Sequence, residues 1–191
     1  MEENLEQQPT DCIKIVLFGP ESTGKTTMCE RLAKYYNTVC APEYMREYLQ
    51  EKWDRERKVC EVKDLLPIAR GQMKNENTQA KNANKILFCD TDLLEIKVYS
   101  KAYYNGYCPP LLLKPALNNW YDLYFLTNID SPWIPDDLRD KPLDREGMFQ
   151  KFKSALQENQ RPFIILKGEE NERFETAITA INELIEKQSE F

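Results

Sequence analysis

Residues 13–26 read Ile-Lys-Ile-Val-Leu-Phe-Gly-Pro-Glu-Ser-Thr-Gly-Lys-Thr, and this stretch decides the fold. Its first part, Ile13–Phe18, is an apolar run of the kind that forms a buried strand. The remainder, Gly19–Thr26, matches G-x-x-x-x-G-K-[ST], the pattern of a phosphate-binding loop or P-loop. Residues 25–36 follow with the apolar spacing of an amphipathic helix. The sequence therefore predicts a strand, a P-loop and a helix in direct succession.

A P-loop binds phosphate because its backbone N–H groups and the positive end of the next helix point at the same place. Lys25 is predicted to reach the β and γ phosphates of ATP and to act in catalysis, and Thr26 to bind Mg²⁺. We expect Lys25 to lie in solvent at the start of its helix. The residues predicted to bind ATP here are Gly19, Pro20, Glu21, Ser22, Thr23, Gly24, Lys25, Thr26 and Thr27.

Short apolar runs and helical patterns alternate along the rest of the chain, which favours a parallel sheet covered on both faces. We predict an α/β protein with a three-layer α/β/α P-loop NTPase fold, a five-stranded parallel sheet and a lid segment. Residues 1–11 are expected to be a disordered leader and residues 12–191 one domain. The further strands are expected at 38–41, 86–89, 123–126 and 163–166, and helices at 43–53, most of 62–84, near 93–103, from 149 to 156 and near 174–185.

Acidic residues follow two of these strands at the edge where open α/β sheets bind ligands. Asp90 ends an apolar strand and is predicted to hold Mg²⁺. Asp92 is our preferred group to face the acceptor hydroxyl, although it also suits the N-terminal cap of a helix. Glu43 follows the second strand and is the other candidate for accepting a proton from the acceptor. The sequence leaves the choice among these carboxylates open.

Composition excludes several classes of function. The 191 residues carry a net charge of −6 and no basic run, which argues against a nucleic-acid partner. The absence of histidine excludes a Ser-His-Asp triad and histidine-containing zinc sites. No apolar stretch is long enough to cross a membrane and the N-terminus lacks the features of a signal peptide, so we expect a cytoplasmic protein with no membrane partner. Its six cysteines are expected to be reduced, mostly as small core residues.

The segment 131–147 combines prolines with many charges and few apolar residues, so it is too polar to be core. We expect a lid whose Arg139 and Arg145 close over the phosphates, since a guanidinium fork matches phosphate oxygens. Arg139 is also a predicted catalytic residue. The alternative is a surface loop in which these arginines pair with nearby aspartates.

Several stretches together resemble the ribosylnicotinamide kinase domain of NadR-type proteins, a branch of the P-loop nucleoside and nucleotide kinases. Asp-Thr-Asp at 90–92, Glu-Tyr-Met-Arg-Glu-Tyr at 43–48 and Trp-Ile-Pro-Asp-Asp-Leu-Arg at 133–139 are the more particular matches. The P-loop and Tyr-Asn-Thr at 36–38 also match, and Ala-Arg-Gly-Gln at 69–72 matches more weakly. These stretches lie within residues 13 to about 150.

The resemblance implies ATP-dependent, Mg²⁺-assisted phosphorylation of the ribose 5′-hydroxyl of nicotinamide riboside, giving nicotinamide mononucleotide and ADP. Larger members carry a helix-turn-helix and an adenylyltransferase domain, and we expect neither here but a free-standing kinase domain. The substrate-binding residues that it implies, together with the aromatic side chains suited to a cationic ring, are Glu43, Tyr44, Arg46, Tyr48, Arg70, Gln72, Asp92 and Trp133.

Two other functions fit the same residues. One is a kinase for another nucleoside or nucleotide, and the other is an ATP-binding sensor without useful turnover. The sequence does not indicate an oligomeric state. A panel of acceptors with ATP would separate the three, because a kinase releases ADP with its own acceptor and a sensor releases none.

Overall fold

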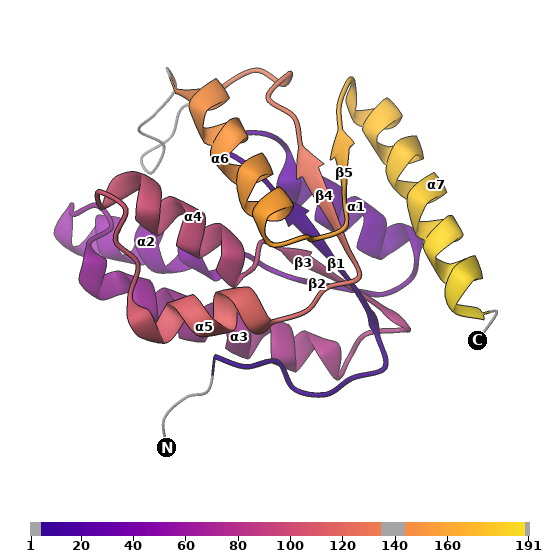
Figure 1. The fold of residues 1–191 in the computed structure, drawn as a ribbon, viewed down its shortest axis with the longest axis horizontal. Helices are drawn as coiled ribbons and strands as arrows, with labels where there is room; N and C mark the ends of the chain where they lie inside the picture. Colours follow the sequence, from indigo (N-terminus) through magenta and orange to yellow (C-terminus); the bar gives the residue numbers. More distant parts are fainter. Residues whose placement is uncertain (1–4, 135–143, 190–191) are drawn as a thin grey trace.

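The computed structural model describes residues 5–134 and 144–189, which form a three-layer α/β/α arrangement (Figure 1). The central sheet is parallel throughout, with strand order β2-β3-β1-β4-β5. The predicted fold class is therefore confirmed. The strands are β1 (Ile13–Phe18), β2 (Val39–Ala41), β3 (Ile86–Asp90), β4 (Leu123–Thr127) and β5 (Phe163–Leu166).

Alternate residues of the strands face two separate hydrophobic cores, as the two-residue period of a strand requires. Val16 and Phe18 belong to a core shared with α4 and α6, whereas Ile15 and Leu17 belong to a core shared with α1 and α7. Figure 1 shows these helices around the sheet. Both faces of β1 are covered, so all its residues are buried. The helices are α1 (Lys25–Tyr35), α2 (Tyr44–Glu56), α3 (Leu65–Ala80), α4 (Leu93–Tyr103), α5 (Pro110–Asn118), α6 (Arg145–Glu158) and α7 (Glu170–Ser189).

A third hydrophobic cluster lies among α3, α4 and α5, and it includes Leu5 from the N-terminal segment. The expectation of a disordered leader is wrong for residues 5–11. Leu5 is buried, its carbonyl accepts a hydrogen bond from Asn119 Nδ2, and the Gln7 side chain bonds to Glu76. Residues 5–8 are held in place because Leu5 packs in this cluster and nearby amide groups form hydrogen bonds with α3 and with the α5–β4 connection. Residues 1–4 lie outside the described residues.

Two helical segments differ from the expected pattern. The segment expected from 62 to 84 is a short 3₁₀ turn, Val62–Asp64, followed by α3. The helix α5 lies outside the helices expected from the sequence, and it contains two prolines, Pro110 and Pro115. Pro110 begins the helix, where its missing N–H costs nothing, and Pro115 is tolerated within it.

The cysteines also differ from the expectation of reduced core residues. Cys29 of α1 and Cys40 of β2 form a disulfide, because α1 packs directly against β2 and brings the two side chains together. Cys89 is a buried free thiol, as expected for a small core residue, and Cys12, Cys60 and Cys108 are free and half-buried.

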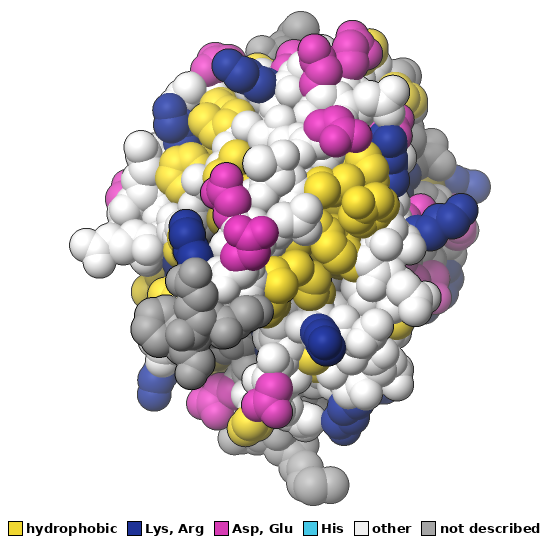
Figure 2. Space-filling model, turned by 90° about the vertical axis from the view of Figure 1, so that its right-hand side faces the viewer, with side chains coloured by type: hydrophobic (Ala, Val, Ile, Leu, Met, Phe, Trp, Pro, Cys, Tyr) yellow, Lys and Arg dark blue, Asp and Glu magenta, His cyan; other side chains and the backbone are white. Residues whose placement is uncertain are grey.

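The side of the molecule that carries α7 has a band of hydrophobic side chains running across it between charged residues (Figure 2). β5 is the last strand of the sheet, and Phe163, Ile164 and Ile165 are only half-buried. In the described part of the chain, no helix has both the length and the hydropathy that crossing a membrane would need.

Candidate active site

The P-loop joins β1 to α1 through backbone conformations that require glycine. Gly19 has φ 137°, and a Cβ there would lie 2.7 Å from Oγ1 of Thr127, at the end of β4. Gly24 has φ 83° and is the N-cap of α1. Thr23 Oγ1 lies 2.6 Å from Thr127 Oγ1, so a hydroxyl pair joins the loop to β4. The loop conformation thus depends on β4, which is distant in sequence: Thr23 and Thr127 are 104 residues apart.

Lys25 is buried, with 8% of its surface exposed, which corrects the expectation that it lies in solvent. Its Nζ donates hydrogen bonds to the carbonyls of Gly19, at 2.8 Å, and Pro20, at 3.0 Å. The same atom lies 3.3 Å from Oε1 of Glu95 on α4. Burial opposes the charge on Lys25, but the carboxylates of Glu95, Glu43 and Asp90 outweigh burial and raise its pKa. The ammonium is therefore held as a fixed positive charge inside the site.

Asp90 lies at the carboxyl end of β3 beside the P-loop, as predicted. The Thr26 hydroxyl donates to Asp90 Oδ2 at 2.6 Å, and Asp90 Oδ1 is buried without a hydrogen-bond partner. Burial raises the pKa of Asp90, and the charge of Lys25 opposes that rise. A buried carboxylate oxygen without a partner, beside a hydroxyl, is a donor set that suits Mg²⁺.

The described residues contain no group of three or more His, Cys, Asp or Glu side chains that could hold a metal by themselves. This agrees with a Mg²⁺ ion that takes its other ligands from substrate phosphates and water. Thr26 and Asp90 therefore fit the ion that the sequence predicts, as residues that would hold it jointly with nucleotide phosphates.

Asp92 does not converge with Asp90, although the two residues stand only two positions apart. Thr91 between them has φ 71°, in the left-handed region that a β-branched residue rarely adopts, and this breaks the alternation of the strand. Asp92 caps α4: its Oδ1 accepts from Glu95 N at 2.9 Å and its Oδ2 from the Tyr124 hydroxyl at 2.8 Å. Burial raises the pKa of Asp92 to about 7. The structure thus favours the capping role that the sequence left open as an alternative.

A cavity of about 540 Å³ opens beside the P-loop. The loop residues Glu21 to Thr27 line one side and α2 lines the other, where Glu43 and Arg46 reach the cavity. Glu43 is the N-cap residue of α2, so it stands at the carboxyl end of β2 as predicted. Of the three carboxylates considered for proton transfer, Glu43 is the one that lines this cavity.

A second cavity of about 160 Å³ continues from the first, and Glu21, Met45, Leu49 and Tyr99 line both. Its walls are mostly apolar and aromatic. The Tyr99 hydroxyl, at the boundary of the two cavities, is buried without a hydrogen-bond partner. The remaining lining residues are Val59, Cys60, Leu65, Ser100, Tyr103 and Tyr104.

Comparison with known proteins agrees with this geometry. The family model described as an AAA domain matches residues 14–173. The chain belongs to this AAA domain family.

Its curated relatives include the trifunctional NAD biosynthesis/regulator protein NadR of Escherichia coli and that of Salmonella typhimurium. Each is 28% identical over 186 residues, which cover 96% of this chain and 45% of the relative. This AAA domain protein therefore spans about half the length of the curated relatives it matches. The resemblance to NadR-type proteins that the motifs indicated is confirmed at this level of similarity.

Solved structures show the same fold. A crystal structure of NadR protein in complex with NR has a TM-score of 0.71 and 24% identity, and the match covers 91% of this chain and 52% of that one. The thymidylate kinase of Ehrlichia chaffeensis has a TM-score of 0.64 and 16% identity, covering 91% of this chain and 100% of that one. These likenesses show the fold of the AAA domain protein.

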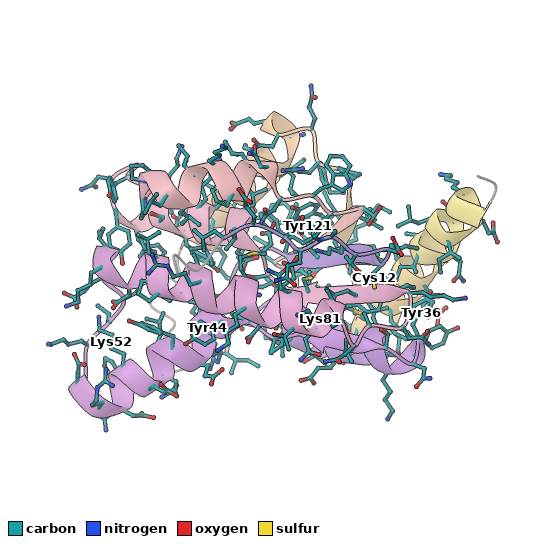
Figure 3. The ribbon with its side chains drawn as sticks, turned by 90° about the horizontal axis from the view of Figure 1, so that it is seen from below. Cys12, Tyr36, Tyr44, Lys52, Lys81 and Tyr121 are labelled. Atoms are coloured by element: carbon teal, nitrogen blue, oxygen red, sulfur yellow. A yellow bond between two sulfur atoms is a disulfide. The ribbon has the colours of Figure 1, made fainter. Side chains whose placement is uncertain are left out.

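Several residues predicted to bind substrate lie outside both cavities and make contacts that hold α2 against α3. The backbone N–H of Tyr44 donates to Gln72 Oε1 at 2.8 Å, and the Tyr44 ring lies where a side chain on Gly71 would otherwise stand. Figure 3 shows Tyr44 between these two helices. The Tyr48 hydroxyl donates to Asp64 at 3.1 Å. Tyr44, Tyr48 and Gln72 do not line the cavity, but their contacts position Glu43, which does.

Arg70 and Trp133 do not line either cavity. Arg70 is a half-buried residue of α3. Trp133 lies beside Arg145, whose guanidinium carbon is 5.8 Å from the Trp133 ring centre. Arg145 begins α6 and donates to the carbonyls of Ser131, at 2.8 Å, and Ser22, at 3.3 Å, so it touches the P-loop backbone. Arg139 and the middle of the predicted lid, residues 135–143, lie outside the described residues.

Sequence reasoning missed three residues of the site. Glu95 follows Asp92 by three positions, the spacing of a capping box, but its carboxylate reaches Gly19 and Lys25 instead of the helix end. Arg173 of α7 donates to the Thr23 carbonyl at 2.7 Å, and Thr127 of β4 contacts the loop as described above. Each acts across a long sequence separation, so no local pattern could reveal it.

Proposed function

We propose that this chain is an ATP-dependent kinase for a small molecule, with nicotinamide riboside as its acceptor. The observation that carries the proposal is the pair of joined cavities. The larger is bordered by the groups that bind nucleotide phosphates, and the smaller has the aromatic, apolar walls that suit a planar ring. A donor and an acceptor bound in them would meet beside Lys25 and Glu43.

ATP would bind with its phosphates against the N–H groups of the P-loop. Lys25 supplies a fixed positive charge where negative charge develops on the transferring phosphoryl group. Thr26 and Asp90 would hold Mg²⁺, which neutralises phosphate charge. Arg145 lies against the loop at Ser22, and Arg139, outside the described residues, is proposed to join it over the phosphates.

The acceptor would place its ring in the smaller cavity and its ribose near Glu43. The ring of nicotinamide riboside is cationic, and Tyr99, Tyr103 and Tyr104 offer it aromatic surfaces beside the carboxylate of Glu21. The acceptor 5′-oxygen then bonds to the γ-phosphorus as the bond to the ADP oxygen breaks. Glu43 accepts the hydroxyl proton. Likeness to the NadR relatives, whose name includes NAD biosynthesis, supports this choice of acceptor.

The experiment is a panel of nucleosides and nucleoside monophosphates, each incubated with ATP and Mg²⁺ and read by mass spectrometry. We expect nicotinamide riboside to gain one phosphate faster than any other acceptor, and Lys25→Ala to abolish the reaction. A faster product from another nucleoside would assign the chain to that acceptor instead. Binding of ATP without any phosphorylated product would identify a nucleotide sensor.

A further inference from the structure

Glu95 is buried between the P-loop and the start of α4, with 1% of its surface exposed. Its two oxygens contact opposite ends of the loop. Oε2 accepts a hydrogen bond from the Gly19 N–H at 3.2 Å, and Oε1 lies 3.3 Å from Nζ of Lys25. Glu95 therefore joins the first residue of the loop to its lysine.

The Lys25 ammonium has three N–H donors, and three oxygens surround it: the carbonyls of Gly19 and Pro20 and the carboxylate of Glu95. A nucleotide phosphate that binds Lys25 must therefore displace one of these partners. The two carbonyls belong to the loop backbone and move only with the loop. Glu95 is the partner that carries the same sign of charge as the incoming phosphate.

When Lys25 binds a phosphate and no longer pairs with Glu95, the buried surroundings of Glu95 disfavour a negative charge on its side chain. Burial raises the pKa of Glu95 well above its ordinary value, and the charge of Lys25 opposes that rise while Glu43 and Asp92 add to it. A carboxylate held by one lysine in such a place competes directly with phosphate for that lysine.

We propose that Glu95 is a positioning residue for the phosphate site. Its carboxylate holds Lys25 and the Gly19 N–H in place in the ligand-free protein, and the nucleotide phosphate takes its place at Lys25. The proposal rests on the proposed function only in requiring that Lys25 bind nucleotide phosphate. It needs no particular acceptor.

The first experiment measures MgATP binding by titration calorimetry in the absence of acceptor. Glu95→Gln keeps the shape of the side chain and an acceptor for the Gly19 N–H but removes the competing charge. We expect its Kd for MgATP to fall about threefold to tenfold, the size of a coupling between contacting groups. Turnover should show KM for ATP falling and kcat falling together, because the lysine is less firmly placed. Glu183→Gln, the same change at an exposed position of α7, is the matched control and should leave Kd unchanged.

The second experiment needs no ligand. Lys25→Ala leaves Glu95 buried without its counter-ion, so the melting temperature should fall, and adding Glu95→Gln to that variant should restore most of the loss. An unchanged or larger Kd for MgATP in Glu95→Gln would overturn the proposal, and so would a double variant no more stable than Lys25→Ala. If the unaltered protein does not bind MgATP, the proposed function and this proposal both fail. If the unaltered protein binds MgATP but Glu95→Gln does not bind it more tightly, only this proposal fails.

Discussion

At the scale of single residues, Lys25 combines a role in chemistry with a buried ion pair, and its removal should therefore have two effects. We expect Lys25→Ala to abolish phosphoryl transfer, because the charge that stabilises the transferring phosphoryl group is gone. We also expect a loss of about 3–5 kcal/mol of stability, the usual cost of leaving one partner of a buried pair alone. ADP release and denaturant unfolding measure the two effects. Lys34→Ala, at an exposed position of the same helix, should change neither. Near-normal turnover in Lys25→Ala would contradict the phosphate site.

The carboxylates Glu43 and Asp92 should separate clearly when each is replaced by its amide. Glu43 lines the cavity beside Lys25, whereas both oxygens of Asp92 are engaged by Glu95 N and Tyr124. We expect Glu43→Gln to lower kcat by roughly 10²–10⁴, the contribution of a general base. Asp92→Asn should keep more than a tenth of normal turnover, since an amide oxygen can still cap α4. Steady-state kinetics with saturating ATP measures kcat for both variants. A larger loss of kcat in Asp92→Asn than in Glu43→Gln would identify Asp92 as the general base.

The candidate site residues that the structure places where the sequence expects them are those whose position depends on local order. The P-loop and Asp90 follow directly from a strand, a turn and a helix that are contiguous in the chain. Asp92 was misplaced because the left-handed backbone of Thr91 cannot be read from the alternation of a strand. Glu95 was missed because its partners follow the neighbouring strand β1 and are distant in sequence, as the Gly19–Glu95 separation of 76 residues shows.

At the scale of elements, one buried ion pair determines how the end of α2 meets the start of α3. Lys52 Nζ lies 2.5 Å from Asp64 Oδ2 and 2.7 Å from Glu61 Oε2, and Figure 3 shows Lys52 between the two helices. The connection held in this way, residues 57–61, carries Val59 and Cys60 into the wall of the smaller cavity. The pair therefore supports the proposed acceptor site without touching it.

Lys52→Met should accordingly raise KM for the acceptor and leave KM for ATP unchanged. It should also cost about 3–5 kcal/mol of stability, because Asp64 stays buried and loses its counter-ion. A Lys52→Met/Asp64→Leu variant should recover most of that stability, as apolar replacements of buried pairs usually do. Equal changes in both KM values would show that the connection does not act on the acceptor cavity alone.

The same pair should give stability a dependence on acid pH. Burial favours the neutral acid, but the hydrogen bonds from Lys52, the Glu61 N–H and the Tyr48 hydroxyl together outweigh burial and lower the pKa of Asp64. A folded-state pKa below the unfolded value of about 4 means that this stability is present above pH 4 and is lost as pH falls through the folded pKa. Denaturant unfolding between pH 2 and 7 should show the loss, and the Lys52→Met/Asp64→Leu variant should show less of it.

Elements with a clear period were predicted well, and elements defined by their packing were not. The five strands and α7 have unmistakable apolar patterns, so sequence placed them within a few residues. The helix α5 is stabilised by burying Leu112 and Ala116 against α3 and α4, which outweighs the prolines in its sequence. The ordered segment from Leu5 has a single apolar side chain to bury, and only the folded surface of α3 shows where it goes.

At the scale of the whole molecule, the last helix is tied to the first loop. Arg173 of α7 is 5% exposed, and its guanidinium donates to the carbonyls of Gly168, at 2.8 Å, Thr23, at 2.7 Å, and Asn128, at 3.2 Å. It also pairs with Asp130. One side chain thus joins the P-loop, the end of β4 and the start of α7, three segments that meet only when the sheet is complete. The phosphate site is therefore a property of the entire domain.

Arg173→Met tests this connection. The loop would lose the donor that fixes Thr23, so we expect the Kd for MgATP to rise about tenfold, a change of about 1.4 kcal/mol. Stability should fall by about 2–4 kcal/mol, because the buried Thr23 carbonyl and two partly buried carbonyls lose a charged donor at once. Arg55→Met, which removes an arginine from an exposed pair with Glu56, should change neither quantity measurably. If Arg173→Met lowers stability but leaves the Kd for MgATP unchanged, the C-terminal helix supports the fold without shaping the phosphate loop.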